Sequence, residues 1–151
     1  LNFEYALRDL YLKASTATGD PVGRQILERL ASQQGDHLAF MVRIHAHWRD
    51  VGCVLNEKPF STMPLPHQTD NLARLAPAGH PTDAPDNEIA ILRRLMDAES
   101  EAAACYQNLL EQLPADVRPI FTGLLDIRQR HRAIAHAEIL FLSANDAWFS
   151  L

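Results

Sequence analysis

Cysteine is scarce in this chain of 151 residues, and the two that occur, Cys53 and Cys105, stand alone. They provide neither a Cys-x-x-Cys metal motif nor a framework of disulfides. Glycine is also rare, with 6 residues, whereas stretches rich in Leu, Ala, Glu, Arg and Gln favour helix. The sequence therefore predicts an all-α protein.

Long apolar runs are missing as well, since none approaches the roughly 20 residues that a membrane-spanning helix needs. The formal net charge of −5 argues against binding to nucleic acid or to an anionic membrane. No signal peptide is visible, so a cytoplasmic location is expected. The length and the hydrophobic content of 47% predict a single globular domain over residues 1–151.

Four stretches in which apolar residues recur every three or four positions predict four helices. Between the first two, Gly19 ends one helix, Asp20 caps the next and Pro21 occupies its first position. The predicted helices cover Asn2–Thr18, Val22–Asp50, Asp86–Leu113, and a stretch that starts between Asp116 and Pro119 and ends near Ser143.

Residues 52–86 contain six of the nine prolines and show no sustained period, apart from a possible helical turn near Asn71–Leu75. So long a loop is uncommon within a domain, but a four-helix bundle with a crossover connection requires one. We therefore expect two antiparallel hairpins, 1–51 and 87–144, joined by this linker and followed by an apolar tail, 145–151. Because the crossover returns the chain to its starting end, the second and third helices should run parallel.

An internal repeat links the two hairpins. Each contains a Glu, a Tyr seven residues later, and a His 33 or 32 residues after the Glu. These residues are Glu4, Tyr11 and His37 in the first hairpin and Glu99, Tyr106 and His131 in the second.

The repeat places each Glu level with its His. Both lie about 16 or 17 residues from the turn of their hairpin, which corresponds to roughly 24 Å along a helix. The two pairs can therefore face each other and converge in the interior. A single His on an apolar stripe is more often a core residue than a ligand, but two matched pairs indicate descent from a metal site.

These motifs resemble those of the rubrerythrin-like branch of the ferritin-like superfamily. That family has Glu-x-x-Ala-x-x-aromatic-Tyr on one helix and Leu-Ala-x-x-Glu-x-x-His on the next. In this chain the first half has Glu4…Tyr11 and then Leu30-Ala31-x-x-Gln34-x-x-His37. The second half has Glu99-x-x-Ala102-x-x-Cys105-Tyr106 and then Leu124-Leu125-x-x-Arg128-x-x-His131. The resemblance implies a ferritin-like four-helix bundle that reduces peroxide or oxidises iron. It also implies four metal ligands, Glu4, His37, Glu99 and His131, with Tyr11 and Tyr106 near the metal.

The chain departs from the family at Gln34 and Arg128, which stand where a Glu would precede the His by three residues. An intact site sets four carboxylates against two divalent ions, whereas Glu4 and Glu99 supply only two and balance one ion at most. A buried Arg128 would pair with Glu99 or Glu4. The carboxylates must be neutralised by a metal, by Arg128 or by protons, so we expect no metal or one ion of iron, manganese or zinc per chain.

Two functions follow from these residues, and a third, a bundle that binds a small ligand in its interior, has no specific feature of the sequence behind it. The first is a metal-poor or metal-free structural or interaction protein. The alternative is a mononuclear or di-metal redox protein, which would need an external electron donor because no rubredoxin-type cysteine motif is present. The apolar tail Ala147–Leu151 needs a surface to pack on, which is either its own bundle or a second subunit. A homodimer is expected in either functional case, because the short first helix and the tail Trp148–Leu151 leave apolar surface that it would cover.

Several other polar residues are expected outside the site. Glu138 lies too far along the helix from His131 to share an ion, and Glu88 is expected at an ordinary capping or exposed position. The remaining histidines, His45, His47, His67, His80 and His136, are expected on the surface or in the linker.

Overall fold

The computed structural model describes residues 1–53 and 85–149, and in these the fold is entirely helical, without a strand. The prediction of an all-α protein with four helices is confirmed for this part of the chain. The helices are α1 (Asn2–Ala17), α2 (Pro21–Val51), α3 (Pro85–Leu110) and α4 (Arg118–Asn145). None of them is long and apolar enough to cross a membrane.

The turn between α1 and α2 forms as its residues predict. The side chain of Asp20 accepts hydrogen bonds from the backbone N–H groups of Val22 at 2.7 Å and Gly23 at 3.0 Å. Pro21 begins α2, where its missing N–H would have no partner in the helix.

The ends of the third predicted helix need correction. Helix α3 begins at Pro85, so Asp86 lies in its first turn instead of capping it, and the predicted linker 52–86 overlaps the helix. Its other end comes at Leu110, before Leu113, because the approach to Pro114 disfavours helical backbone. The helical turn predicted near Asn71–Leu75 lies outside the described residues.

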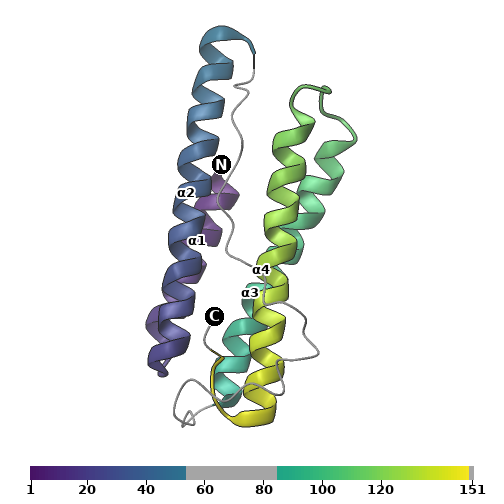
Figure 1. The fold of residues 1–151 in the computed structure, drawn as a ribbon. Coiled ribbons are helices and arrows are strands. Elements are labelled where there is room, and N and C mark those ends of the chain that lie inside the picture. The colour runs from purple at the N-terminus through teal and green to yellow at the C-terminus, as the bar shows by residue number, and fades with distance from the viewer. Residues whose placement is uncertain (54–84, 150–151) are drawn as a thin grey trace.

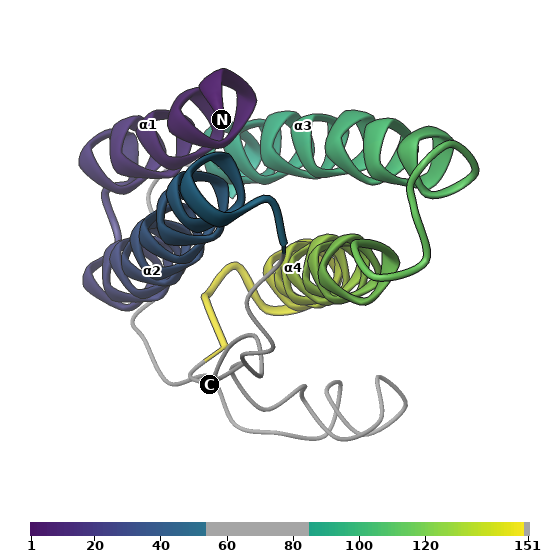
Figure 2. The ribbon, with the colours of Figure 1, turned by 90° about the horizontal axis from the view of Figure 1, so that it is seen from above.

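The four helices form two adjacent pairs. Helix α1 lies beside the lower part of α2, and α3 lies beside α4 (Figure 1). Seen from above, the two pairs stand next to each other around a shared interior (Figure 2). In Figure 1 the chain advances upwards along both α2 and α3, as predicted for these two helices.

A polar layer divides the hydrophobic core. Along α2, Leu30 belongs to one apolar cluster and Phe40 to another, and the buried Gln34 and His37 lie between them. On α4, the buried Arg128 and His131 likewise separate Leu124 from Ile134. The polar layer is therefore held between two apolar regions that exclude water from it.

The C-terminal tail packs onto its own chain. Trp148 is 0% exposed, and its indole lies against Gly23 so closely that a Cβ at that position would overlap the ring. The indole N–H also donates to Glu88 of α3. The expectation that Trp148 leaves apolar surface for a partner subunit is therefore wrong, because the missing side chain at Gly23 makes room for the indole. The last two residues of the tail, Ser150 and Leu151, lie outside the described residues.

Candidate functional site

The four residues predicted as ligands come from four different helices and meet in the polar layer. Glu4 and Glu99 are 0% exposed, His37 is 2% and His131 is 3% exposed. The rings of His37 and His131 stack with their centroids 5.9 Å apart, and Nδ1 of His131 lies 3.1 Å from Oε1 of Glu99. The predicted convergence of these residues in the interior is confirmed.

Arg128 lies at the middle of this group and is 0% exposed. Its Nη1 is 3.1 Å from Oε2 of Glu99, and its Nη2 is 3.5 Å from Oε2 of Glu4. The same Nη2 lies 3.0 Å from Oε1 of Gln34 and 3.4 Å from Nδ1 of His37. The predicted pairing of Arg128 with a carboxylate is confirmed, and it extends to both carboxylates. We call this group the interior centre, and its members are Glu4, Gln34, His37, Glu99, Arg128 and His131.

The two tyrosines of the repeat bind across the bundle. The hydroxyl of Tyr11 donates to Oε1 of Glu99 at 2.7 Å, and the hydroxyl of Tyr106 donates to Oε1 of Glu4. Each tyrosine therefore donates to the carboxylate of the other hairpin. This exchange means that the two halves of the repeat are related in their contacts as well as in their spacing.

Gln34 is oriented by Arg128. Since Nη2 of Arg128 donates to the amide oxygen of Gln34, the amide nitrogen faces Nδ1 of His131 at 2.9 Å and Oε1 of Glu99 at 3.4 Å. Nδ1 of His131 lies 3.1 Å from Oε1 of Glu99 as well, and its Nε2 lies 3.2 Å from Oε1 of Gln33. Both ring nitrogens of His131 are therefore held by polar side chains.

His37 is held neutral by its surroundings. Burial, followed by the charges of the nearby Arg128 and His131, lowers its pKa to about 3. Because the pKa of an unfolded His is about 6.5, the unfolded chain binds an extra proton between these two values. The free energy of unfolding therefore falls as the pH drops through this window.

The tyrosines and the arginine keep their protons. Burial, followed by the charge of Glu99, raises the pKa of Tyr11, and burial with the charge of Glu4 does the same for Tyr106. Burial alone would lower the pKa of Arg128, but the two carboxylates outweigh it, and the pKa is raised. All three side chains thus remain donors toward the carboxylates.

The donor set of the interior centre does not fit two divalent ions. When ionised, Glu4 and Glu99 carry a charge of −2, and Arg128 already supplies +1 next to both of them. Nη2 of Arg128 also lies 3.4 Å from Nδ1 of His37, so the guanidinium occupies the space beside a nitrogen that could bind an ion. Within residues 1–53 and 85–149, no three His, Cys, Asp or Glu side chains are grouped so that they could hold an ion. Two buried atoms of the interior centre, Nε of Arg128 and Oε2 of Glu4, have no hydrogen-bond partner among these residues.

Glu88 was expected to be an ordinary capping or exposed residue, but it is only 2% exposed. Its Oε1 accepts from the backbone N–H groups of Gly19 at 3.0 Å and Asp20 at 3.3 Å, and its Oε2 accepts from Trp148. It therefore ties α3 to the first turn and to the tail. No sequence signal reveals this role, because it depends on which loop faces α3.

Glu138 forms a second buried polar contact, at 1% exposed. Its Oε2 accepts from the backbone N–H of Phe149 at 3.0 Å. Burial raises the pKa of Glu138 to about 8, against the lowering effect of this hydrogen bond and with a smaller contribution from Asp20. The burial of Glu138 could be inferred from the sequence, because Glu138 lies seven residues after His131 and therefore on the same face of α4.

The remaining histidines lie away from the interior centre. His45 and His136 are exposed, as expected, and His47 is half-buried. The Nε2 atom of His47 lies 3.8 Å from Sγ of Cys53. His67 and His80 lie outside the described residues.

Comparisons with models of known families, with curated proteins and with solved structures find no match for this chain. The geometry of the interior centre therefore has to support the functional argument by itself.

Proposed function

We propose that this chain is a ferritin-like four-helix protein that works without a metal, as a structural or interaction module. The observation that carries the proposal is the position of Arg128, fully buried between Glu99 and Glu4. In this arrangement the guanidinium supplies the positive charge that metal ions supply in the family that the sequence resembles.

The arrangement of the helices supports a ferritin-like topology. The chain runs down α1 and up α2, then up α3 and down α4 (Figure 1). Two antiparallel hairpins with a crossover between α2 and α3 are the pattern of ferritin-like bundles. The exchange of tyrosine hydrogen bonds between the hairpins supports the same relation.

Electrostatics explain why an arginine can take this place. Two ionised carboxylates buried in an apolar surrounding are costly unless a cation and hydrogen-bond donors face them. Arg128 provides the cation, and the hydroxyls of Tyr11 and Tyr106 provide donors for the remaining negative charge. Protein groups thus supply a counter-charge for both carboxylates and a hydroxyl donor for each, which supports folding without an ion.

Metal analysis tests this proposal. The protein is incubated anaerobically with excess ferrous iron, desalted and analysed for metal. We expect well under one ion per chain for the wild type. The double variant Gln34→Glu/Arg128→Glu restores four carboxylates, and it should bind about two ions per chain, as intact sites of this kind do. Iron should also raise its melting temperature, because a ligand that binds only the folded state stabilises it.

The matched control is the double variant Gln129→Glu/Arg130→Glu, which makes the same two types of substitution on α4 outside the interior centre. It should bind no more iron than the wild type. One ion per wild-type chain would instead support the alternative, a mononuclear redox protein with an external electron donor. A double variant in the centre that folds but gains no metal would contradict the assignment of Gln34 and Arg128 to former ligand positions.

A further inference from the structure

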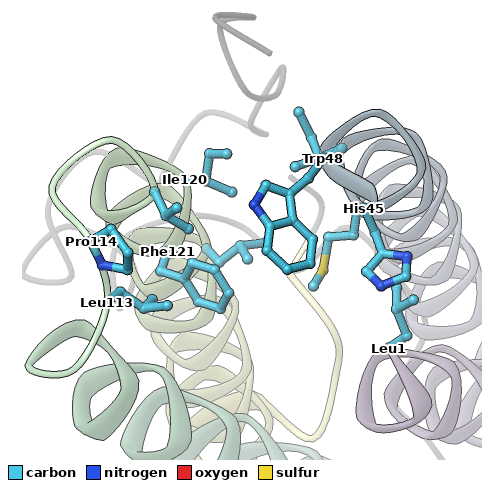
Figure 3. Close-up of a pocket in the computed structure, with 11 residues that line it drawn as sticks. Leu1, His45, Trp48, Leu113, Pro114, Ile120 and Phe121 are labelled. Carbon is cyan, nitrogen blue, oxygen red and sulfur yellow. The ribbon is translucent and has the colours of Figure 1, made fainter. Parts of the chain in front are cut away.

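A cavity of about 380 Å³ lies outside the interior centre, between α2 and α4. It lies at the end of the bundle where α2 ends and where the connection from α3 enters α4 (Figure 3). Eleven residues line it, and all except His45 have apolar side chains. None of them belongs to the interior centre, so the cavity is a separate site.

The two main sides of this cavity come from α2 and α4. Met41, Ile44 and Trp48 of α2 line one side, and Ile120, Phe121 and Leu124 of α4 line the other.

Aromatic side chains reach into this space. In Figure 3 the indole of Trp48 extends from α2 toward Ile120 and Phe121 of α4. Trp48 is 53% exposed, whereas the other tryptophan of the chain, Trp148, is fully buried. A half-exposed indole at the edge of an apolar cavity gains much from a ligand that covers it, because its ring is a large apolar surface.

The lining defines the chemistry of the occupant. No Asp, Glu, Lys or Arg side chain lines the cavity, so the lining side chains offer no acidic or strongly basic group to replace the hydration of a charged ligand. The imidazole of His45 is the one polar side chain in the lining, and its two ring nitrogens can hydrogen-bond. By contrast, a smaller cavity of about 220 Å³ between α1 and α3 includes Lys13 and Arg94 in its lining, so it offers no such uncharged surrounding.

We propose that the cavity between α2 and α4 is a binding site for an uncharged apolar small molecule with an aromatic or branched hydrocarbon body. The ligand would pack between Trp48 and Phe121, and any single polar group on it would face His45. The volume lies within the range of about 300–1,000 Å³ that is usual for small-molecule sites. This site goes beyond the proposed function, and it would exist whether or not the interior centre holds a metal.

Two probes with the same ring system test the charge requirement. N-phenylnaphthylamine is uncharged, and anilinonaphthalene sulfonate carries a negative charge on the same skeleton. Titration of the whole chain, followed by probe fluorescence, should show saturable binding of one uncharged probe per chain. The sulfonate should bind at least tenfold more weakly, and this comparison needs no variant.

A matched pair of variants tests the location. Trp48→Glu places a charge at the edge of the cavity and should weaken binding of N-phenylnaphthylamine at least tenfold. Val51→Glu is the control, because it introduces the same charge at an apolar residue of α2 that does not line the cavity. Val51 is 60% exposed and Trp48 is 53% exposed. The control should change the affinity for N-phenylnaphthylamine less than twofold. Circular dichroism verifies that both variants are folded, and Trp48→Gln replaces the first variant if it is not.

Three results would overturn this inference: binding that does not saturate, equal affinity for the two probes, or equal loss of binding in the two variants. A wild-type dimer in light scattering that Trp48→Glu dissolves, together with no probe binding, would show instead that a second copy covers the cavity. Metal content is measured on the same samples, so failure of this site and failure of the metal-free proposal are told apart.

Discussion

Replacing Arg128 by Ala should strongly destabilise the fold, because it removes the cation between two buried carboxylates. The side chain of Arg128 is 0% exposed, and those of Glu99 and Glu4 are 0% and 1% exposed. The variant loses ion pairs of 3.1 Å and 3.5 Å, and it also loses the 3.0 Å hydrogen bond that orients Gln34. Both carboxylates would then be buried without a counter-charge.

Removal of one partner from a buried ion pair costs about 3–5 kcal/mol in the free energy of unfolding. For a domain of this size, 1 kcal/mol lowers the melting temperature by about 2–4 °C, so the expected loss is roughly 6–20 °C. Thermal and urea unfolding of the purified variant measure both quantities. Arg128→Met, which keeps the volume but not the charge, should lose a similar amount.

Arg130→Ala is the matched control on the same helix. Its side chain is 34% exposed and pairs with Asp126 at 2.8 Å in contact with solvent, so the change should stay within about 0.5 kcal/mol. Combining Arg128→Met with Glu99→Gln and Glu4→Gln removes all three charges and should restore most of the lost stability. An Arg128→Ala variant as stable as the wild type would refute this account of the interior centre.

Three further predictions concern other parts of the molecule. The folded pKa of Glu138 is about 8 and its unfolded value is about 4.3, so the folded state holds the extra proton and stability falls as pH rises through this window. Between pH 6.5 and 8 the titration of His37 no longer contributes. Over this range the free energy of unfolding of the wild type, measured in urea, should fall by roughly 1–2 kcal/mol more than that of Glu138→Gln. Equal pH dependence of the two proteins would contradict this. Gly23→Ala should destabilise by roughly 1–3 kcal/mol because its Cβ overlaps the indole of Trp148, whereas Gly35→Ala, with open space around the added Cβ, should stabilise α2 by about 0.5–1 kcal/mol. Light scattering at high micromolar concentration tests the predicted homodimer, which would have to form through surface other than Trp148, and a monomer would contradict it.

The sequence by itself determined the helices and the level of the polar layer. Asp20 and Pro21 set the start of α2 because a capping carboxylate and a fixed proline φ act locally. The constant rise of an α-helix then brought Glu99 and His131 to one height from their spacing alone. The same periodicity placed Arg128 on the face of His131, so its burial next to a carboxylate could be expected.

Only the tertiary structure decided which groups meet across the bundle. Spacing gives the face on which Tyr11 lies, but its bond to Glu99 of the other hairpin depends on the rotation and offset between hairpins, which no local pattern encodes. The burial of Glu88 and the packing of Trp148 on Gly23 have the same origin, since they join segments that are far apart in the chain. Local backbone chemistry and helical period therefore fix what each helix offers, and the packing of whole helices decides what each side chain contacts.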